Sequence, residues 1–332
     1  MAALSRDPDA LTEAMLDGDR RALARLITLV ENRADATASV MSKVFAKCGR
    51  AFTIGITGPP GAGKSTITSA MIEHLRERGR SVGVVAIDPS SPFSGGSVLG
   101  DRIRMQKHFL DDKVFIRSVS TRGSHGGLAR SARDVARLLD AFGKDVVIIE
   151  TVGVGQTELD IMEVADSVVV VLVPEAGDTV QVMKAGLLEI ADVFVVNKAD
   201  RDGATRMRTE LEMMLALKAH ETDRTWKVPV LMTQASEGKG TQELLDAALA
   251  HHKHCKESTV DETRRAQRLR AEVLEICEEE VMRRLRDGVS GGALKALLDG
   301  VDGKGRDPYG AALDILGDEG RLAAVLARDD DR

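Results

Sequence analysis

Twelve residues, GITGPPGAGKST at positions 55–66, constrain the fold of this chain more than any other stretch. They match the pattern GxxxxGK(S/T) and lie between an apolar run, AFTIGIT, and a helical pattern, ITSAMIEHLRER. In this strand–loop–helix order the glycines let backbone N–H groups turn toward phosphate oxygens. Lys64 can reach the β- and γ-phosphates, and the Ser65 hydroxyl can ligate Mg²⁺. The sequence therefore predicts a nucleotide phosphate site made of Gly58, Pro59, Pro60, Gly61, Ala62, Gly63, Lys64, Ser65 and Thr66.

Short β-branched runs alternate with helical stretches from Ala51 onward: AFTIGIT, SVGVVAID, KVFIRSV, DVVIIET, SVVVVLV, DVFVVNK and VPVLMTQ. This alternation predicts βαβ units around a buried parallel sheet. The run KVFIRSV and the helical stretch after it favour an all-parallel sheet with an inserted βα unit. We therefore expect an α/β fold, a P-loop NTPase with a mostly parallel central sheet flanked by helices. Helical patterns before and after it predict an N-terminal helical extension (1–48), a P-loop domain (49–256) and a C-terminal helical arm (257–332), whose apolar stripe must pack against another surface.

The stretch VFVVNKAD predicts which base is bound, because an apolar strand ends there in Asn197, Lys198 and Asp200. A carboxylate can accept two hydrogen bonds from guanine, from N1–H and the N2 amine, whereas adenine would leave it unpaired. Asn197 can support the loop, and the stem of Lys198 can lie along the base. The backbone of Ala235 and Ser236, after the next strand, can cap the guanine edge. The expected nucleotides are GTP and GDP.

Three carboxylates are candidates for a Mg²⁺ site together with Ser65. Glu150 ends the run DVVIIE, and Asp88 and Asp101 lie at the two ends of the small-residue segment DPSSPFSGGSVLGD. Asp88 should emerge at the same edge of the sheet as the phosphate loop. A segment ordered by nucleotide and metal can then bring Asp101 back to the site. The alternative is that Asp88 caps a turn and Asp101 caps the following helix.

The residues after Glu150 predict slow turnover. Gly153 can place its N–H on a γ-phosphate, so Lys64, Glu150 and Gly153 are the catalytic candidates. Small GTPases carry a glutamine directly after this glycine, whereas this chain has Val154, and its Gln156 comes later. Residues 174–192 are either a plain connection or a third switch that reports the nucleotide state to a partner. The switch and partner candidates are Gln156, Asp178, Gln181 and Lys184.

Composition excludes several classes of protein. The net charge of −6 disfavours a nucleic-acid partner, and no apolar run is long enough to cross a membrane. Three widely spaced cysteines argue against a disulfide framework and for a cytoplasmic protein or, in a eukaryote, one inside an organelle. The histidines and the cysteine of AHHKHCKE, residues 250–257, are either a transition-metal site or the polar end of a helix with one histidine packed inward.

The segments GPPGAGKST, DPSSPFSGGSVLGDRIRM, ETVGVGQTE and PEAGDTVQVMKAG…NKAD together resemble the MeaB/ArgK/MMAA family of P-loop GTPases. The similarity covers most of the chain, including ALARLITLVE near the start and DPYGAALDIL near the end. The resemblance implies a chaperone that gates adenosylcobalamin loading into an acyl-CoA mutase, usually methylmalonyl-CoA mutase, and protects it. It also implies a homodimer, a phosphate–Mg²⁺ centre formed by Lys64, Ser65, Asp88, Asp101 and Glu150, and a third switch around 177–188.

Two other functions remain open. One is an ATPase or kinase associated with amino-acid transport, which the NKAD loop disfavours. The other is a nickel-delivery GTPase, which would need a dedicated histidine and cysteine site.

Overall fold

The protein is represented by a computed structural model, which describes residues 7–32, 36–88, 105–120, 127–151, 153, 160–174, 186–219, 225–258, 260–289, 301, 307–318, 320 and 323. The chain divides into two compact units, residues 1–257 and residues 258–332. The first unit carries the sheet, the phosphate loop and the NKAD turn. The described elements of the second unit are helices.

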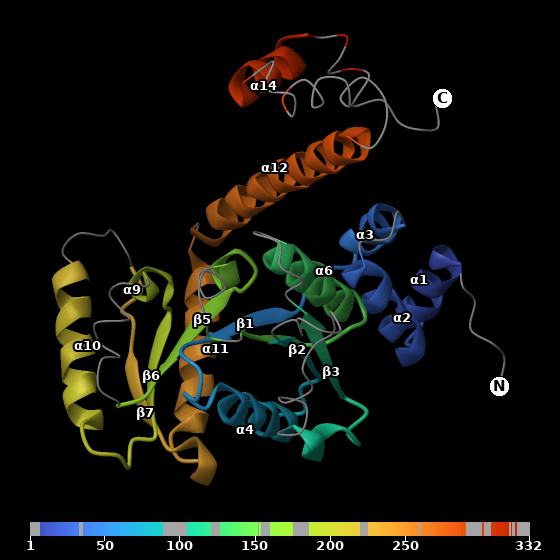
Figure 1. Cartoon of the computed structure of the whole chain (residues 1–332). Coiled ribbons are helices and arrows are strands. Elements are labelled where there is room, and N and C mark those ends of the chain that lie inside the picture. The colour runs from blue at the N-terminus through green and yellow to red at the C-terminus, as the bar shows by residue number, and fades with distance from the viewer. Residues whose placement is uncertain are drawn as a thin grey trace. The chain divides into compact units, whose positions relative to one another are not determined.

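A seven-stranded parallel sheet forms the centre of the first unit, as the sequence predicts (Figure 1). Its strand order is β3-β2-β4-β1-β5-β6-β7. Every registered pair is parallel, and the added strand β3 lies at one edge. The strands are β1 (Phe52–Thr57), β2 (Val82–Asp88), β3 (Val114–Ser120), β4 (Val146–Glu150), β5 (Ser167–Leu172), β6 (Val193–Asn197) and β7 (Val230–Thr233).

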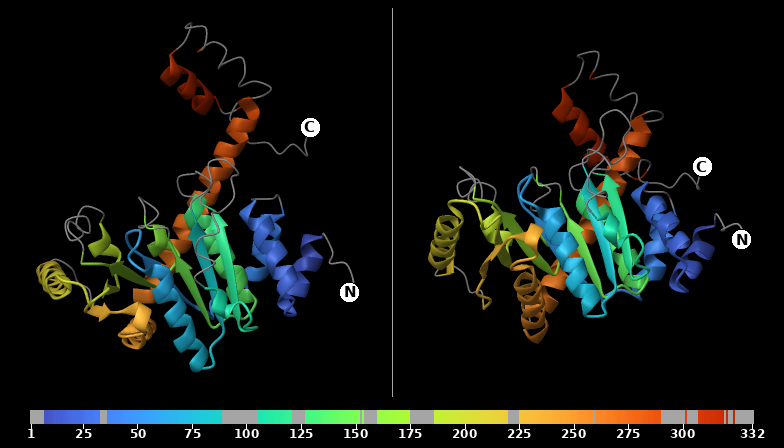
Figure 2. Two further views of the ribbon diagram at one scale, coloured as in Figure 1. Left: turned by 60° about the horizontal axis from the view of Figure 1, so that its bottom comes forward. Right: turned by 90° about the horizontal axis from the view of Figure 1, so that it is seen from below.

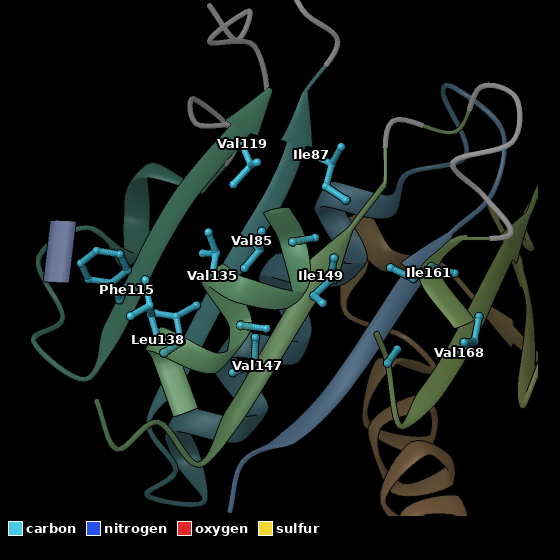
Figure 3. Close-up of a cluster of buried hydrophobic side chains, with 14 of the residues drawn as sticks. Val85, Ile87, Phe115, Val119, Val135, Leu138, Val147, Ile149, Ile161 and Val168 are labelled. Carbon is cyan, nitrogen blue, oxygen red and sulfur yellow. The ribbon is translucent and has the colours of Figure 1, made fainter. Parts of the chain in front are cut away.

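Both faces of the sheet are buried, which explains why the strands are continuous apolar runs rather than alternating ones. In β4, Val147 and Ile149 belong to one hydrophobic cluster, while Val146 and Ile148 belong to the other. Figure 3 shows Val147 and Ile149 packed with residues of the neighbouring strands and of helix α6. Since side chains alternate along a strand, Glu150 lies on the same face as Ile148.

Helices cover each face of the sheet (Figures 1 and 2). Helix α4 (Lys64–Glu77) and helix α11 (Thr241–Glu257) contact each other and pack in the cluster that contains Ile148. Helix α6 (Gly127–Ala141) packs on β2, β3 and β4 on the opposite face, and α10 (Ala204–Ala219) contributes to the same cluster. Short elements are η1 (Gln106–His108), η2 (Ile161–Glu163), α9 (Leu187–Ile190) and η3 (Ala235–Glu237).

Three helices precede the sheet: α1 (Pro8–Leu16), α2 (Arg20–Glu31) and α3 (Thr37–Phe45). Helices α2 and α3 pack against α6, and α1 packs against α2 and α3. Asp7 and Asp19 cap α1 and α2, because each carboxylate accepts hydrogen bonds from backbone N–H groups of the first turn. Arg117 of β3 donates to Glu31 at 2.5 Å, which ties α2 to the edge of the sheet. The helical extension expected for residues 1–48 is therefore part of the first unit.

The second unit contains α12 (Val260–Val289) and α14 (Pro308–Gly317). Both helices carry exposed apolar side chains, which are Val273, Leu274, Ile276, Met282, Tyr309, Leu313 and Leu316. Within the described ranges, every helix is too short or too polar to span a lipid bilayer.

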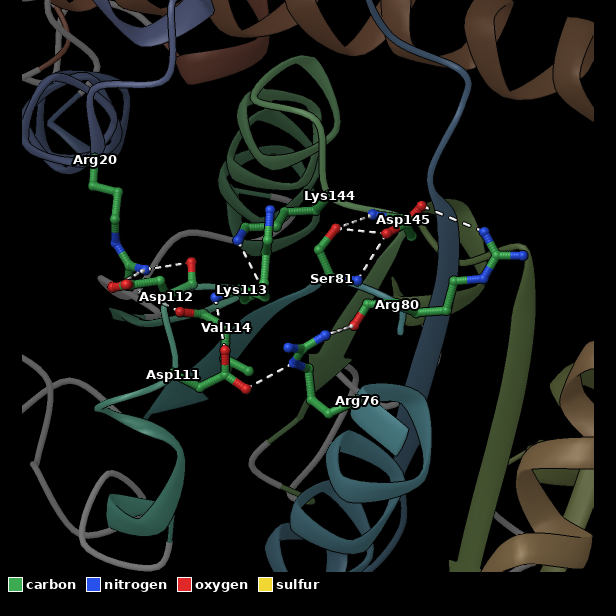
Figure 4. A network of polar contacts seen from close by, with 10 residues as sticks. All are labelled: Arg20, Arg76, Arg80, Ser81, Asp111, Asp112, Lys113, Val114, Lys144 and Asp145. Carbon is green, nitrogen blue, oxygen red and sulfur yellow. Dashed lines mark hydrogen bonds and ion pairs between the residues drawn. The ribbon is translucent and has the colours of Figure 1, made fainter. Parts of the chain in front are cut away.

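Polar groups join the amino ends of β2, β3 and β4, at the edge opposite the phosphate loop (Figure 4). Arg20 donates to the carbonyl of Asp112 at 2.6 Å and to that of Val114 at 2.9 Å. The Ser81 hydroxyl and backbone N–H both donate to Asp145 at 2.7 Å. These contacts hold together strand ends that are far apart in the sequence.

Lys144 is the member of this network whose burial in the charged form lowers the stability of the fold. It is 5% exposed, and its ammonium donates to the carbonyl of Lys113 at 2.9 Å. Burial, with the nearby charges of Arg20 and Lys113 acting in the same direction, lowers the pKa of Lys144 from 10.5 to about 8. The charged form is therefore less stable in the folded chain than in the unfolded chain at neutral pH.

We expect the free energy of unfolding to rise between pH 8 and pH 10.5 because of Lys144. In this window the folded lysine has lost a proton that the unfolded chain still holds, and stability then increases with pH. The Lys144→Met variant should be up to about 3 kcal/mol more stable at pH 7, from about 1.4 kcal/mol per pKa unit. Urea unfolding at pH 7 and pH 10 measures both effects, with Lys47→Met as the control at an exposed lysine. Equal pH dependence in wild type and Lys144→Met would contradict this account.

Candidate nucleotide-binding site

The phosphate loop connects β1, which ends at Thr57, to α4, which begins at Lys64. Gly63 has φ of +90° and is the residue before the helix, so the first turn of α4 points its N–H groups at the loop. Lys64 is buried, and its ammonium donates to the carbonyls of Gly58 at 2.8 Å and Pro59 at 3.0 Å. The positive charge is thereby held inside the curve of the loop, where a polyphosphate can bind.

Asn197 joins the phosphate loop to the base-recognition strands. Its amide nitrogen donates to the carbonyl of Ala62 at 2.8 Å. Its amide oxygen accepts from the Thr233 hydroxyl at 3.0 Å and from the Ala235 N–H at 3.2 Å. Because Asn197 is 3% exposed, this arrangement fixes three loops at the carboxyl edge of the sheet. The predicted supporting role of Asn197 agrees with this geometry.

The turn after Asn197 presents Asp200 to the exterior. Lys198 has φ of +56°, a left-handed conformation that few side chains adopt without a specific reason. The N–H of Ala199 donates to the Thr233 carbonyl at 3.0 Å, so the turn is attached to β7. Asp200 and Ser236 are exposed, as residues that bind a base from outside must be.

Glu150 lies at the end of β4, on the face covered by α4. It is 2% exposed. The Ser65 hydroxyl donates to Oε1 at 2.5 Å, and the Thr68 hydroxyl donates to Oε2 at 2.9 Å. The phosphate loop and the predicted metal carboxylate are thus directly connected.

Gly153 approaches the phosphate loop closely and has φ of +88°. A Cβ at this position would collide with the Gly58 carbonyl oxygen and with the Lys64 ammonium. The glycine therefore permits both the backbone conformation and the close approach. Gly153 thus lies beside the ammonium of Lys64, the side chain expected to reach the γ-phosphate.

Of the remaining predicted site residues, one is described only in its backbone and the others lie outside the described ranges. Strand β2 ends at Asp88, whose side chain is not described, and Ala86 of the same strand is paired with Glu150. The residues that lie wholly outside the described ranges are Asp101, Gln156, Asp178, Gln181 and Lys184.

Comparison with known proteins agrees with this geometry. Residues 23–290 match the family described as methylmalonyl-CoA mutase-associated GTPase MeaB. The chain belongs to the MeaB family of GTPases. It is an α/β P-loop enzyme that binds guanine nucleotides and hydrolyses GTP.

Several proteins resemble this MeaB-family GTPase over most of its length. A protein of Pyrococcus abyssi named as a GTPase is 47% identical over 309 residues, which is 93% of this chain and 95% of the relative. GTPase ArgK of Escherichia coli K12 is 38% identical over 70% of this chain and 72% of that protein. The mouse mitochondrial methylmalonic aciduria type A homolog is 36% identical over 72% of this chain and 61% of that protein. The crystal structure of a LAO/AO transport system kinase superposes with a TM-score of 0.69, at 26% identity, over 95% of this chain and 99% of that one.

One histidine of residues 250–257, His251, is buried in this MeaB-family GTPase. His251 is 2% exposed, lies 2.6 Å from the Ser167 hydroxyl and contacts Asp192 and Cys255. Across the described part of the chain, no group of three or more His, Cys, Asp or Glu side chains is placed to hold a metal ion. Inward packing of one histidine, the second of the two interpretations, is therefore the one observed.

The motifs alone do not identify Thr68. Ser65 and Thr68 are three residues apart, so they share one face of a helix, and this spacing is the signal that could have found it.

Proposed function

We propose that this MeaB-family GTPase is a metallochaperone that gates adenosylcobalamin loading into a cobalamin-dependent acyl-CoA mutase and protects it. Methylmalonyl-CoA mutase is the partner we propose first. The observation that carries the proposal is the match of residues 23–290 to a family described as associated with that mutase. A mouse relative named for methylmalonic aciduria supports the same partner.

Mg²⁺ is the metal that the oxygen ligands of the site fit. The Ser65 hydroxyl lies 2.5 Å from Oε1 of the buried Glu150 carboxylate, beside the phosphate loop. Hard cations such as Mg²⁺ prefer oxygen ligands and often bind through one or two carboxylates together with substrate phosphates. We propose that Ser65, Glu150, Asp88 and Asp101 hold the ion, which would neutralise charge on the phosphates when bound.

Slow intrinsic turnover is the second part of the proposal. Lys64 and Gly153 meet at the phosphate loop, but the residue after Gly153 is Val154 rather than a glutamine that could position water. A partner that supplies or orders the missing group would complete the site. The segment that reports the nucleotide state to that partner is proposed to be 177–188.

A homodimer built by the C-terminal unit is the third part. The apolar side chains exposed on α12 and α14 include Leu274 and Tyr309, which are 63% and 85% exposed. Such side chains are stabilised when they pack against another surface. A second copy of the same unit, forming a dimerisation arm from residues 257–332, would supply it.

The two other functions make different demands. A transport-associated ATPase or kinase, as the name of one similar structure would have it, needs ATP, so competition of ATP and GTP for the site decides. A nickel-delivery GTPase needs a histidine and cysteine site, and equilibrium dialysis with Ni²⁺ tests for one.

Light scattering after gel filtration tests the proposed partner and the dimer together. We expect a dimer for the full chain, and a monomer that still binds GTP for a chain ending at residue 258. With methylmalonyl-CoA mutase present, the mass should rise to that of a complex, by an amount that differs between GDP and a non-hydrolysable GTP analogue. A full-length monomer would contradict the dimer, and no complex with any nucleotide would contradict the chaperone.

A further inference from the structure

We propose that Thr68 is a positioning residue for GTP hydrolysis, acting through Glu150. Its hydroxyl fixes the second carboxylate oxygen of Glu150, so that the carboxylate faces the metal at the phosphate loop in one orientation. This inference rests on the Mg²⁺ site proposed above.

The geometry of the contact points to this role. Ser65 and Thr68 occupy one face of α4, one turn apart, and both donate to the same carboxylate. The distances are 2.5 Å from Ser65 to Oε1 and 2.9 Å from Thr68 to Oε2. Thr68 is 0% exposed and Ser65 3%, so water cannot easily replace either donor. Each oxygen of the carboxylate is therefore held by its own hydroxyl.

A single hydrogen bond would leave the orientation of the Glu150 carboxylate incompletely fixed. The terminal torsion of glutamate is broad, and its side chain has one more rotatable bond than that of aspartate. Many P-loop GTPases carry an aspartate at this position, and its shorter side chain has less freedom to lose. A second donor one helical turn further along α4 restores that restraint for a glutamate.

The same contact holds the strand end to the nucleotide-binding helix. Glu150 is paired in the sheet with Ile56 of β1 and with Ala86 of β2. Fixing its side chain to α4 therefore aligns the ends of three neighbouring strands with the first turn of that helix. Thr68 contributes to this alignment without reaching the phosphate loop itself.

Three substitutions isolate the Thr68 hydroxyl. Thr68→Val removes the donor and keeps the shape, while Thr68→Ser and Thr68→Ala differ from each other by one oxygen atom. Thr12→Val is the matched control, because Thr12 is 1% exposed and donates at 2.8 Å to the Pro8 carbonyl on α1, remote from the site. If Thr68→Val does not fold, as judged by circular dichroism, the Ser and Ala pair still decides.

Electron paramagnetic resonance of Mn²⁺, used in place of Mg²⁺ with GDP bound, provides a readout independent of turnover. We expect Mn²⁺ to bind about 10–100-fold more weakly to Thr68→Val and Thr68→Ala, the usual effect of removing a group that orients a metal ligand. Thr68→Ser and Thr12→Val should stay within about 2-fold of the wild type. The Mg²⁺ concentration for half-maximal GTP hydrolysis should change by the same factors, while GDP binding without metal should not change.

Equal Mn²⁺ binding by Thr68→Ala and Thr68→Ser would overturn the proposal. Glu150→Gln distinguishes this failure from failure of the metal site. If Glu150→Gln weakens Mn²⁺ and Thr68→Ala does not, only the role of Thr68 is wrong. If neither weakens Mn²⁺, the proposed Mg²⁺ site is wrong as well.

Discussion

The Asp200→Asn variant should bind GTP about 10²–10³-fold more weakly than the wild type and should prefer xanthosine triphosphate. The carboxylate can accept hydrogen bonds from both guanine donors, N1–H and the N2 amine. The amide of asparagine has one acceptor oxygen, and its NH₂ group would face a second donor on guanine. A hydrogen bond to a charged group contributes about 1.5–3 kcal/mol. Losing one or two therefore weakens binding by about 10- to 10⁴-fold, and the expected loss lies in the middle of these limits. Xanthine presents an oxygen where guanine presents an amine, so the new amide donor has an acceptor.

The structure makes Asp200 a suitable position for this exchange. The turn that carries it is fixed by the left-handed Lys198 and by the bond of Ala199 to β7, so the side chain can change without loss of the fold. Asp202→Asn is the matched control, because Asp202 is exposed in the same turn. Isothermal titration with GTP, ATP and xanthosine triphosphate measures the shift. Equal affinity of the wild type for ATP and GTP would refute guanine recognition by Asp200.

The sheet is predictable from the sequence for a physical reason. The five inner strands, β1, β2, β4, β5 and β6, are buried on both faces, so each is a short run rich in β-branched residues that stands out among helical segments. The glycines and the lysine of the phosphate loop are equally visible, because the chemistry of phosphate binding fixes their spacing.

Contacts between elements that are distant in the sequence could not be predicted, because they depend on how those elements are positioned against each other. The contact of Thr68 with Glu150 requires that α4 lie across the end of β4 at one particular height, which no local pattern specifies. The burial of Lys144 likewise depends on the packing of strand ends that are distant in the chain. Asp101 as metal ligand or helix cap, and residues 177–188 as a third switch, stay predictions.

Acceleration of GTP hydrolysis by the mutase is the second large effect expected. An arginine or reordered switch added to an otherwise intact phosphate–Mg²⁺ site increases hydrolysis by about 10³–10⁵-fold in known GTPases. The site has Lys64, Glu150 and Gly153 in contact with the phosphate loop or its helix, but no glutamine directly after Gly153. We expect the mutase to stimulate by at least about 10-fold, toward that range. If GTP and GDP differ in how they favour mutase binding, the mutase must favour one nucleotide over the other by the same factor.

Lys184 is the residue we expect to transmit this effect, because it lies in the proposed third switch. Lys184→Ala should lower the stimulated rate and leave the rate without mutase unchanged. Stimulation that survives in Lys184→Ala would remove only the role of this lysine.

The most direct measurement is the steady-state rate of GTP hydrolysis by the full chain, with and without a cobalamin-dependent acyl-CoA mutase from the same organism. A slow rate alone and an increase of at least about 10-fold with methylmalonyl-CoA mutase is the predicted result. An unchanged rate with every such mutase of that organism would contradict the proposal that this MeaB-family GTPase is completed by a mutase partner.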